Sequence, residues 1–142
     1  MFHQVRQSWQ SQQYCRFWWR FGDTNKPWKT YIYRRTVFGL VDSPFKCVYL
    51  CKQTAERCGV GHTHGVGDPI GDACFYIKNF LYMDDLLLPM SFEPAYCAKV
   101  VQAVKNILES ASFFPHKFLA NDPAILKLIP EDLCSHDLEK NC

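Results

Sequence analysis

Two adjacent carboxylates lie between two apolar, β-prone runs in the stretch Phe75-Tyr76-Ile77-Lys78-Asn79-Phe80-Leu81-Tyr82-Met83-Asp84-Asp85-Leu86-Leu87-Leu88. Such runs predict two strands, so we expect Asp84 and Asp85 at the turn of a hairpin or just before it. Like charges side by side repel, and a divalent cation relieves that repulsion. Carboxylates suit Mg²⁺, so the stretch indicates a metal site for phosphoryl transfer, with a two-metal arrangement as one option. The alternative is a pair of plain turn residues, which aspartate favours.

The overall composition is that of a folded domain. The sequence has 142 residues, 48% of them hydrophobic and 15% aromatic, which is enough to form the core of one ordinary domain. This composition excludes a disordered chain. The net charge of +2 is too small to indicate a nucleic-acid partner by itself. No apolar run reaches the roughly 18 residues of a membrane-spanning helix, so we expect no membrane partner.

Basic and aromatic side chains are interleaved in the first third of the chain. The basic residues are Arg6, Arg16, Arg20, Lys26, Lys29, Arg34 and Arg35, and the aromatic residues among them are Trp9, Tyr14, Phe17, Trp18, Trp19, Trp28, Tyr31 and Tyr33. This pattern suits contact with phosphates and stacking on bases. An equally good interpretation is a strand-rich core beneath a solvated, charged face.

Eight cysteines are spread along the chain, at Cys15, Cys47, Cys51, Cys58, Cys74, Cys97, Cys134 and Cys142. None forms a Cys-x-x-Cys pair, so a zinc ribbon is not expected. The start, Met1–Gln4, lacks the basic and then apolar run of a secretory signal. We therefore expect an intracellular protein, cytoplasmic or nuclear and not secreted, whose cysteines are reduced core residues.

The first half of the chain predicts a hairpin and a helix. Two β-prone segments, residues 14–21 and 29–38, flank a polar turn and predict the hairpin. A helix follows, capped by Asp42 or Ser43 and ending near Cys58 at the glycine that comes next. Its apolar face is expected to hold Phe45, Val48, Tyr49 and Ala55.

A glycine-rich loop and a second helix flank the acidic hairpin. Residues 59–72 hold five of the seven glycines and predict a flexible loop. In this loop His62 and His64 are candidate metal ligands, although two histidines without further ligands are more often incidental. After the hairpin, Ser91 can cap a helix of residues 93–111. Its apolar stripe consists of Cys97, Val100, Val101, Val104, Ile107, Leu108 and Ala111.

The order of the elements predicts the fold class. A short apolar segment at residues 113–119 completes the series hairpin, helix, acidic hairpin, helix, strand. This series predicts an α+β fold in which an antiparallel sheet is covered by helices on one face. An α+β interaction protein without catalytic function stays open here. It predicts that Asp84 and Asp85 do not lie together at an exposed hairpin tip.

Several blocks, in this order, resemble the palm of a reverse transcriptase of the Pao/BEL retrotransposon type. Tyr82-Met83-Asp84-Asp85 resembles the polymerase motif with two of the three metal-binding aspartates. Residues 38–44 resemble the motif that supports the incoming nucleotide and template, and residues 1–5 resemble the end of the motif that carries the third aspartate. Residues 114–120 resemble the late palm segment, and residues 121–133 the way such chains continue. The resemblance implies a partial palm domain, residues 1–142, from a longer polyprotein.

The resemblance also implies an activity and a set of site residues. The activity is that of an RNA-directed DNA polymerase, which adds deoxynucleotides from their triphosphates to a primer 3′-hydroxyl by two-metal chemistry. Asp84 and Asp85 would be the catalytic ligands of Mg²⁺. The residues implied to contact the nucleotide or the primer end are Phe2, Phe38, Gly39, Met83 and Lys117, with Phe2 as the gate against a sugar 2′-hydroxyl. Those implied to support the RNA or DNA template-primer are Tyr82, Ser43 and Pro44.

The family's first catalytic aspartate falls upstream of Met1 in this resemblance, so we expect the chain to be inactive alone. The alternative is a non-enzymatic remnant, domesticated or degraded, that binds nucleic acid. The two interpretations differ in their need for metal. A polymerase site requires a divalent ion, whereas a binding remnant holds nucleic acid by salt-sensitive phosphate contacts without one.

Overall fold

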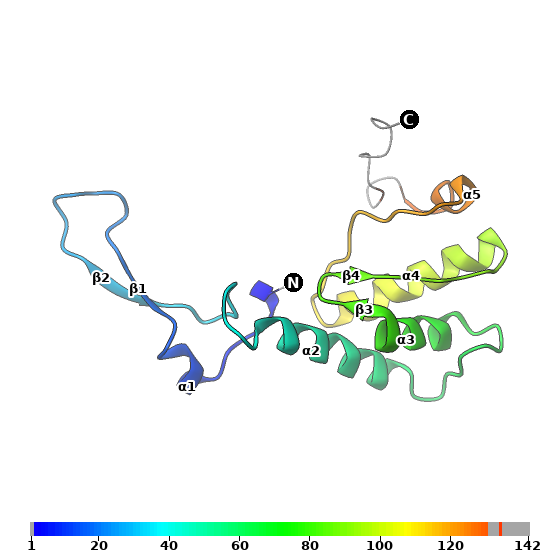
Figure 1. Ribbon diagram of the computed structural model, residues 1–142, viewed down its shortest axis with the longest axis horizontal. Helices are drawn as coiled ribbons and strands as arrows, with labels where there is room; N and C mark the ends of the chain where they lie inside the picture. Colours follow the sequence, from blue (N-terminus) through cyan, green and yellow to red (C-terminus); the bar gives the residue numbers. More distant parts are fainter. Residues whose placement is uncertain (1, 131–133, 135–142) are drawn as a thin grey trace. The chain divides into compact units, whose positions relative to one another are not determined.

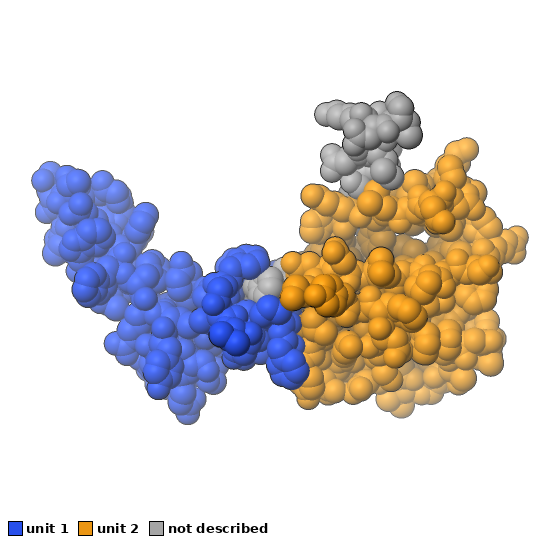
Figure 2. Space-filling view, viewed as in Figure 1, with its two compact units in different colours: residues 1–47 blue, residues 48–142 orange. Residues whose placement is uncertain are grey.

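The computed structural model describes residues 2–130 and residue 134 (Figure 1). The chain divides into two compact units, residues 1–47 and 48–142, and each is described by itself (Figure 2). The described residues contain helices and two separate two-stranded antiparallel sheets, so the protein is α+β as predicted. The predicted single sheet with helices on one face is not what these residues form, because each short hairpin pairs only with itself.

Unit 1 contains the predicted first hairpin. It begins with the 3-10 helix η1 (Phe2–Gln4) and the short helix α1 (Trp9–Gln12). The hairpin follows as β1 (Arg16–Trp19) paired with β2 (Lys29–Ile32). Aromatic and β-branched residues favour these extended segments. The hairpin is confirmed, with strands shorter than predicted.

The interior of unit 1 is small and partly polar. The backbone N–H of Gln7 donates to Arg34 O at 3.1 Å, and that of Thr36 donates to Val5 O at 2.8 Å, which ties the chain start to the segment after β2. The buried residues described in this unit are Val5, Gln7, Cys15, Thr36, Ser43 and Cys47. None of them is aromatic, so the aromatic residues of the first third do not form the strand-rich core that one interpretation required.

Helix α2 (Ser43–Cys58) has the predicted bounds. An ion pair of 2.5 Å between Lys46 and Asp42 spans its first turn. Its apolar face differs from the prediction, because Phe45 is 70% exposed and Tyr49 is 51% exposed. The buried row, spaced four residues apart, is Cys47, Cys51 and Ala55. The prediction was therefore wrong for Phe45 and Tyr49 and correct for Ala55, and Val48 is half-buried.

Helix α3 (Pro69–Phe80) corrects two predictions, because residues 69–72 belong to it and not to the predicted loop over 59–72, and residues 75–80 are helical and not a strand. Residues 59–68 are a loop, as predicted. Asp68 caps the helix by accepting a hydrogen bond from the N–H of Ile70 at 3.0 Å, and Pro69 occupies the first turn. Helical spacing brings Ala73, Tyr76 and Ile77 to the buried side. Burial on this helical face outweighs the β-propensity of the aromatic run.

Helix α4 (Pro94–Ser110) confirms the second predicted helix and packs against α3 (Figure 1). Six of the seven residues of its predicted stripe are buried, and Ala111 is the half-buried C-cap. Ser91 is not the N-cap. That position is taken by Glu93, whose side chain makes no capping hydrogen bond, because Pro94 already starts the helix. The core of unit 2 therefore forms between α3 and α4.

The segment after α4 is mostly irregular. Residues 113–119 do not form the predicted strand, since only Phe118 makes an isolated bridge, to Cys134. Phe113 is nevertheless buried, and the short helix α5 (Pro123–Leu126) contacts α4. None of the helices in the described part of the chain combines the length and the apolar character needed to cross a membrane.

The cysteines are partly as predicted. Cys15, Cys74 and Cys97 are buried free thiols, and Cys58 and Cys134 are half-buried free thiols. Cys47 and Cys51 are buried. Cys142 lies outside the described residues.

Candidate functional site

The acidic motif forms the turn of the second hairpin, which follows directly from α3. Strand β3 (Leu81–Tyr82) pairs with β4 (Asp85–Leu86), so Met83 and Asp84 are the two residues of the turn. The buried side chain of Leu81 and a 3.3 Å hydrogen bond from Leu87 N–H to Phe80 O attach the hairpin to the end of α3. The predicted position at a hairpin turn is confirmed for Asp84, whereas Asp85 is the first residue of β4, directly after the turn.

The backbone at this turn is strained. Met83 has a φ of 49°, in the left-handed region that disfavours a side chain, whereas Asp84 is not among the described residues with positive φ. A positive φ at only the first central residue is typical of a type II′ turn, where glycine is preferred. Met83 is also 48% exposed, so burial does not explain why a bulky residue is held there.

Both carboxylates of the motif face solvent. Asp84 and Asp85 are exposed, and neither side chain makes a hydrogen bond or ion pair with a described residue. Tyr82 is 73% exposed beside them. The turn therefore presents two adjacent anionic groups that have no protein counter-charge among the described residues, which leaves them available to a cation.

Five other predicted site residues belong to unit 1, and four of them lie between β2 and the first turn of α2. Phe38 and Gly39 form a turn in which Phe38 is 69% exposed and meets the ring of His3 edge-on at 5.9 Å. Gly39 has a φ of 89°, which explains the glycine. Ser43 is fully buried and donates from Oγ to Val37 O at 2.8 Å, so its observed role is to fix the start of α2, where Pro44 follows.

Two further predicted residues are not brought to the acidic turn by any described contact. Lys117 lies in the irregular segment after α4, is exposed, and has a φ of 62°. No ion pair joins it to Asp84 or Asp85. The backbone of Phe2 is part of η1, and its side chain lies outside the described atoms.

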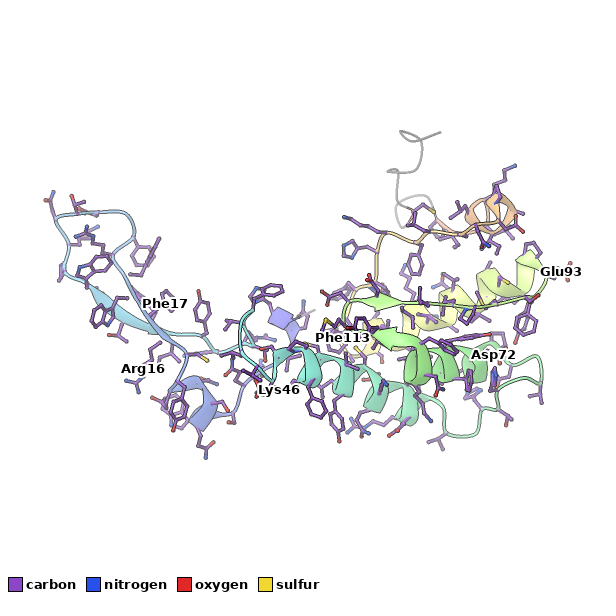
Figure 3. All side chains as sticks on the ribbon, viewed as in Figure 1. Arg16, Phe17, Lys46, Asp72, Glu93 and Phe113 are labelled. Atoms are coloured by element: carbon purple, nitrogen blue, oxygen red, sulfur yellow. The ribbon has the colours of Figure 1, made fainter. Side chains whose placement is uncertain are left out.

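A second polar cluster, around Asp72 of α3, was not predicted as a site. Asp72, which is labelled in Figure 3, is only 1% exposed, yet its carboxylate accepts three hydrogen bonds. Oδ1 accepts from the N–H of Gly65 at 2.8 Å and from His64 Nδ1 at 2.6 Å, and Oδ2 accepts from the Tyr96 hydroxyl at 2.7 Å. The ring of His64 also stacks on Phe75 at 3.7 Å. This cluster fixes the glycine-rich loop to α3 and α3 to α4.

The charges of the cluster are set by burial and hydrogen bonding. Burial opposes ionisation of Asp72, but the hydrogen bonds from Gly65, Tyr96 and His64 outweigh it and lower the pKa of its carboxyl group. Burial, together with the bond to Asp72, raises the pKa of Tyr96 to about 12. An ionised carboxylate can only accept hydrogen bonds, so His64 Nδ1 carries the proton that it donates.

A matching contact lies next to it on the same loop. His62 Nδ1 lies 2.8 Å from Asp68 Oδ2, and this hydrogen bond is the main reason why the pKa of Asp68 is lowered.

Both histidines line a cavity of about 230 Å³ in unit 2, which is bordered by Ala55, Glu56, Gly59, His62, His64, Gly71, Cys74, Phe75 and Lys78. Burial raises the pKa of the Cys74 thiol in this wall, so it is not an activated nucleophile. The sequence signal for these contacts is an aspartate after each histidine: Asp68 follows His62 by six residues, and Asp72 follows His64 by eight.

Metal ligation needs several converging donors. Within residues 2–130 and 134, no three histidine, cysteine, aspartate or glutamate side chains converge as a metal-binding group. Neither the two histidines nor Asp84 and Asp85 therefore belong to such a group among these residues. Comparison with protein families, curated proteins and solved structures found no match.

Proposed function

We propose that the chain is a fragment of the palm of an RNA-directed DNA polymerase, with Asp84 and Asp85 as its metal-binding carboxylates. The observation that supports this most is the tight turn between β3 and β4, which exposes both carboxylates without a described protein partner. Oxygen-only donors of this kind suit Mg²⁺, which proteins usually hold by one or two carboxylates plus substrate phosphates. The strained backbone at Met83 adds support, since strain of this kind gathers at functional sites.

In this proposal the turn residues act on the reacting groups. Bound Mg²⁺ would activate the primer 3′-hydroxyl and neutralise charge on the leaving pyrophosphate. Asp84 and Asp85 hold the ion, and Met83 supports the primer end from the same turn. Lys117 has no described ion-pair partner, so its ammonium group is available to phosphates.

The remaining residues have positioning roles in the same proposal. The exposed ring of Phe38 and the open backbone at Gly39 provide a surface for the incoming nucleotide. Phe2 is the gate against ribonucleotides. Tyr82 and the start of α2, at Ser43 and Pro44, support the template-primer.

A two-metal site also needs more acidic ligands than Asp84 and Asp85, so the proposal requires a further carboxylate from outside the described residues.

Metal binding at the turn tests the proposal directly. The binding of Mn²⁺, as a paramagnetic substitute for Mg²⁺, would be measured by water-proton relaxation for the natural chain and for Asp84→Asn/Asp85→Asn. Glu93→Gln is a matched control, because Glu93 is an exposed acid of the same unit whose side chain makes no capping hydrogen bond. We expect Mn²⁺ binding that the double variant loses and the control keeps.

Primer extension on an RNA template, with Mg²⁺ or Mn²⁺, completes the test. Extension that disappears in the double variant would mean that the catalytic site is complete. Metal binding without extension would fit a donor pair that lacks its further carboxylate. Mn²⁺ binding that is equal in all three proteins would refute the proposed metal site and favour the non-enzymatic alternative.

A further inference from the structure

Five aromatic rings form a continuous strip on one face of the β1–β2 hairpin in unit 1. Residues directly opposite in an antiparallel pair project to the same face, so Phe17 with Tyr31, and Trp19 with Lys29, lie on one side. The ring centroids of Phe17 and Tyr31 lie 5.7 Å apart. The other ring contacts in the strip are Phe17–Tyr33 at 4.6 Å, Phe21–Tyr31 at 5.8 Å and Trp19–Phe21 at 6.5 Å.

Three of the five rings of the strip are exposed, and Phe17 and Tyr31 are half-buried. Phe21 is 70% exposed, Trp19 is 49% exposed and Tyr33 is 43% exposed. Phe21 also has a φ of 56°, an uncommon conformation for a bulky residue, and burial does not compensate for it. A strained, exposed aromatic side chain at the edge of a ring cluster indicates a surface that meets a partner.

Charge identifies the kind of partner. Residues 1–47 carry eight lysines and arginines against two aspartates, whereas residues 48–142 carry eight against twelve acidic residues. Unit 1 is therefore strongly basic in a chain whose net charge is only +2. Lys29 lies on the aromatic face itself, opposite Trp19, and the guanidinium of Arg20 lies 4.4 Å from the ring centre of Trp28 in the same hairpin. A hairpin that carries both exposed aromatic rings and cations complements a polyanion that has exposed flat rings.

We infer that the aromatic strip of Phe17, Trp19, Phe21, Tyr31 and Tyr33 binds single-stranded nucleic acid, with bases stacked on its rings and phosphates contacting the basic residues of the hairpin. Single strands fit better than duplexes, because the faces of paired bases are hidden in the stack. Every base has such a face, so we expect little sequence preference and binding to both RNA and DNA. The inference does not depend on Asp84 and Asp85 or on a metal.

The chain offers a convenient signal for this interaction. All four tryptophans, Trp9, Trp18, Trp19 and Trp28, belong to unit 1, so tryptophan fluorescence reports on that unit alone. The experiment titrates the full chain, in EDTA, with labelled 12-mers of oligouridylate and oligothymidylate and with a duplex of equal length. Fluorescence anisotropy gives the affinity, and quenching of tryptophan fluorescence gives evidence of stacking.

Two variants test the strip and one controls for the opposite face. Trp19→Ala removes a ring of the strip, and Phe21→Gly removes another ring at a position whose φ glycine adopts without strain, so that variant is expected to fold. Trp18→Ala is the control, because Trp18 is 71% exposed, lies opposite Thr30, and projects to the other face. We expect Trp19→Ala and Phe21→Gly each to weaken single-strand binding at least about fivefold. The control should change it less than about twofold.

Three results would overturn the inference. One is single-strand binding that the three variants reduce equally, and another is a duplex bound as tightly as the single strands. The third is a strip that is covered by a second copy of the chain, which sedimentation would reveal as a dimer that Phe21→Gly dissociates. Single-strand binding that persists in EDTA and in Asp84→Asn/Asp85→Asn, but is lost in Phe21→Gly, supports the inference even if the proposed polymerase activity fails.

Discussion

The hydroxyl of Tyr96 on α4 donates a 2.7 Å hydrogen bond to the carboxylate of Asp72 on α3, across 24 residues of sequence. Asp72 is 1% exposed, so this contact places an ionised group inside unit 2. The same carboxylate accepts from Gly65 and His64 of the preceding loop. A buried charge is tolerated only when it is hydrogen-bonded in this way. Asp72 therefore joins α3, α4 and the loop before α3 at one residue.

We expect Tyr96→Phe to destabilise the protein. The substitution keeps the ring and removes the hydroxyl donor, so the buried carboxylate of Asp72 loses one of three hydrogen bonds. Hydrogen bonds to charged groups contribute about 1.5–3 kcal/mol, so the free energy of unfolding should fall by about that amount. Urea unfolding followed by circular dichroism measures the change. Tyr82→Phe is the control, since Tyr82 is 73% exposed, and an effect as large in the control would contradict the prediction.

Acid should lower the free energy of unfolding through Asp72 and Asp68, because the pKa values of both carboxyl groups are lowered in the folded state. A lowered pKa stabilises the fold at a pH above the unfolded value of about 3.9. That stabilisation is lost as the pH falls through the folded pKa. The urea midpoint of unfolding, measured between pH 7 and pH 2.5, should therefore decrease once the pH is below about 4. Asp72→Asn should have a lower urea midpoint at pH 7 than the natural chain and a smaller decrease over this pH range. Parallel curves for the two proteins would argue against a contribution of Asp72 to the acid sensitivity.

Gly71→Ala tests the close contact between α3 and the loop before it. An added Cβ at Gly71 would lie 2.4 Å from the backbone oxygen of Thr63. Alanine favours helices over glycine by roughly 1 kcal/mol, but overpacking against a backbone costs about 1–3 kcal/mol, so the net effect should be a loss of stability. At Gly59 the nearest atoms are 3.0 and 3.3 Å away, so Gly59→Ala should be milder. A thermal melt that ranks the two variants in the opposite order would be inconsistent with this packing.

Met83→Gly should stabilise the acidic hairpin. Met83 has a φ of 49°, which glycine adopts without strain, and its half-exposed side chain loses little packing when removed. Relief of this strain is expected to raise the free energy of unfolding by up to about 1 kcal/mol, since strain of this kind costs at least that much. Asp84→Gly is the matched control, because Asp84 lacks a positive φ and glycine there only adds flexibility to the unfolded chain. Urea midpoints should move up for the first variant and down for the second.

The sequence alone was sufficient where a local rule decides the structure. Helix α2 begins at Ser43 and ends at Cys58, as the proline in its first turn and the glycine directly after it predict. The apolar stripe of α4 repeats at helical spacing and is buried. The Met83–Asp84 turn lies where the paired carboxylates interrupt two apolar runs. Each of these features depends on residues within a few positions of one another.

The tertiary structure decided what local rules left ambiguous. Residues 75–80 have the composition of a strand, yet they complete α3, because Ala73, Tyr76 and Ile77 are buried on one helical face. Asp72 became a buried anchor because α4 brings Tyr96 to it. Most aromatic residues of the first third are exposed, and none is buried, because a two-stranded hairpin has too little surface to bury them. Periodicity and capping are encoded within a few residues, whereas burial depends on which distant segment packs against a face, and that is settled only when the chain folds.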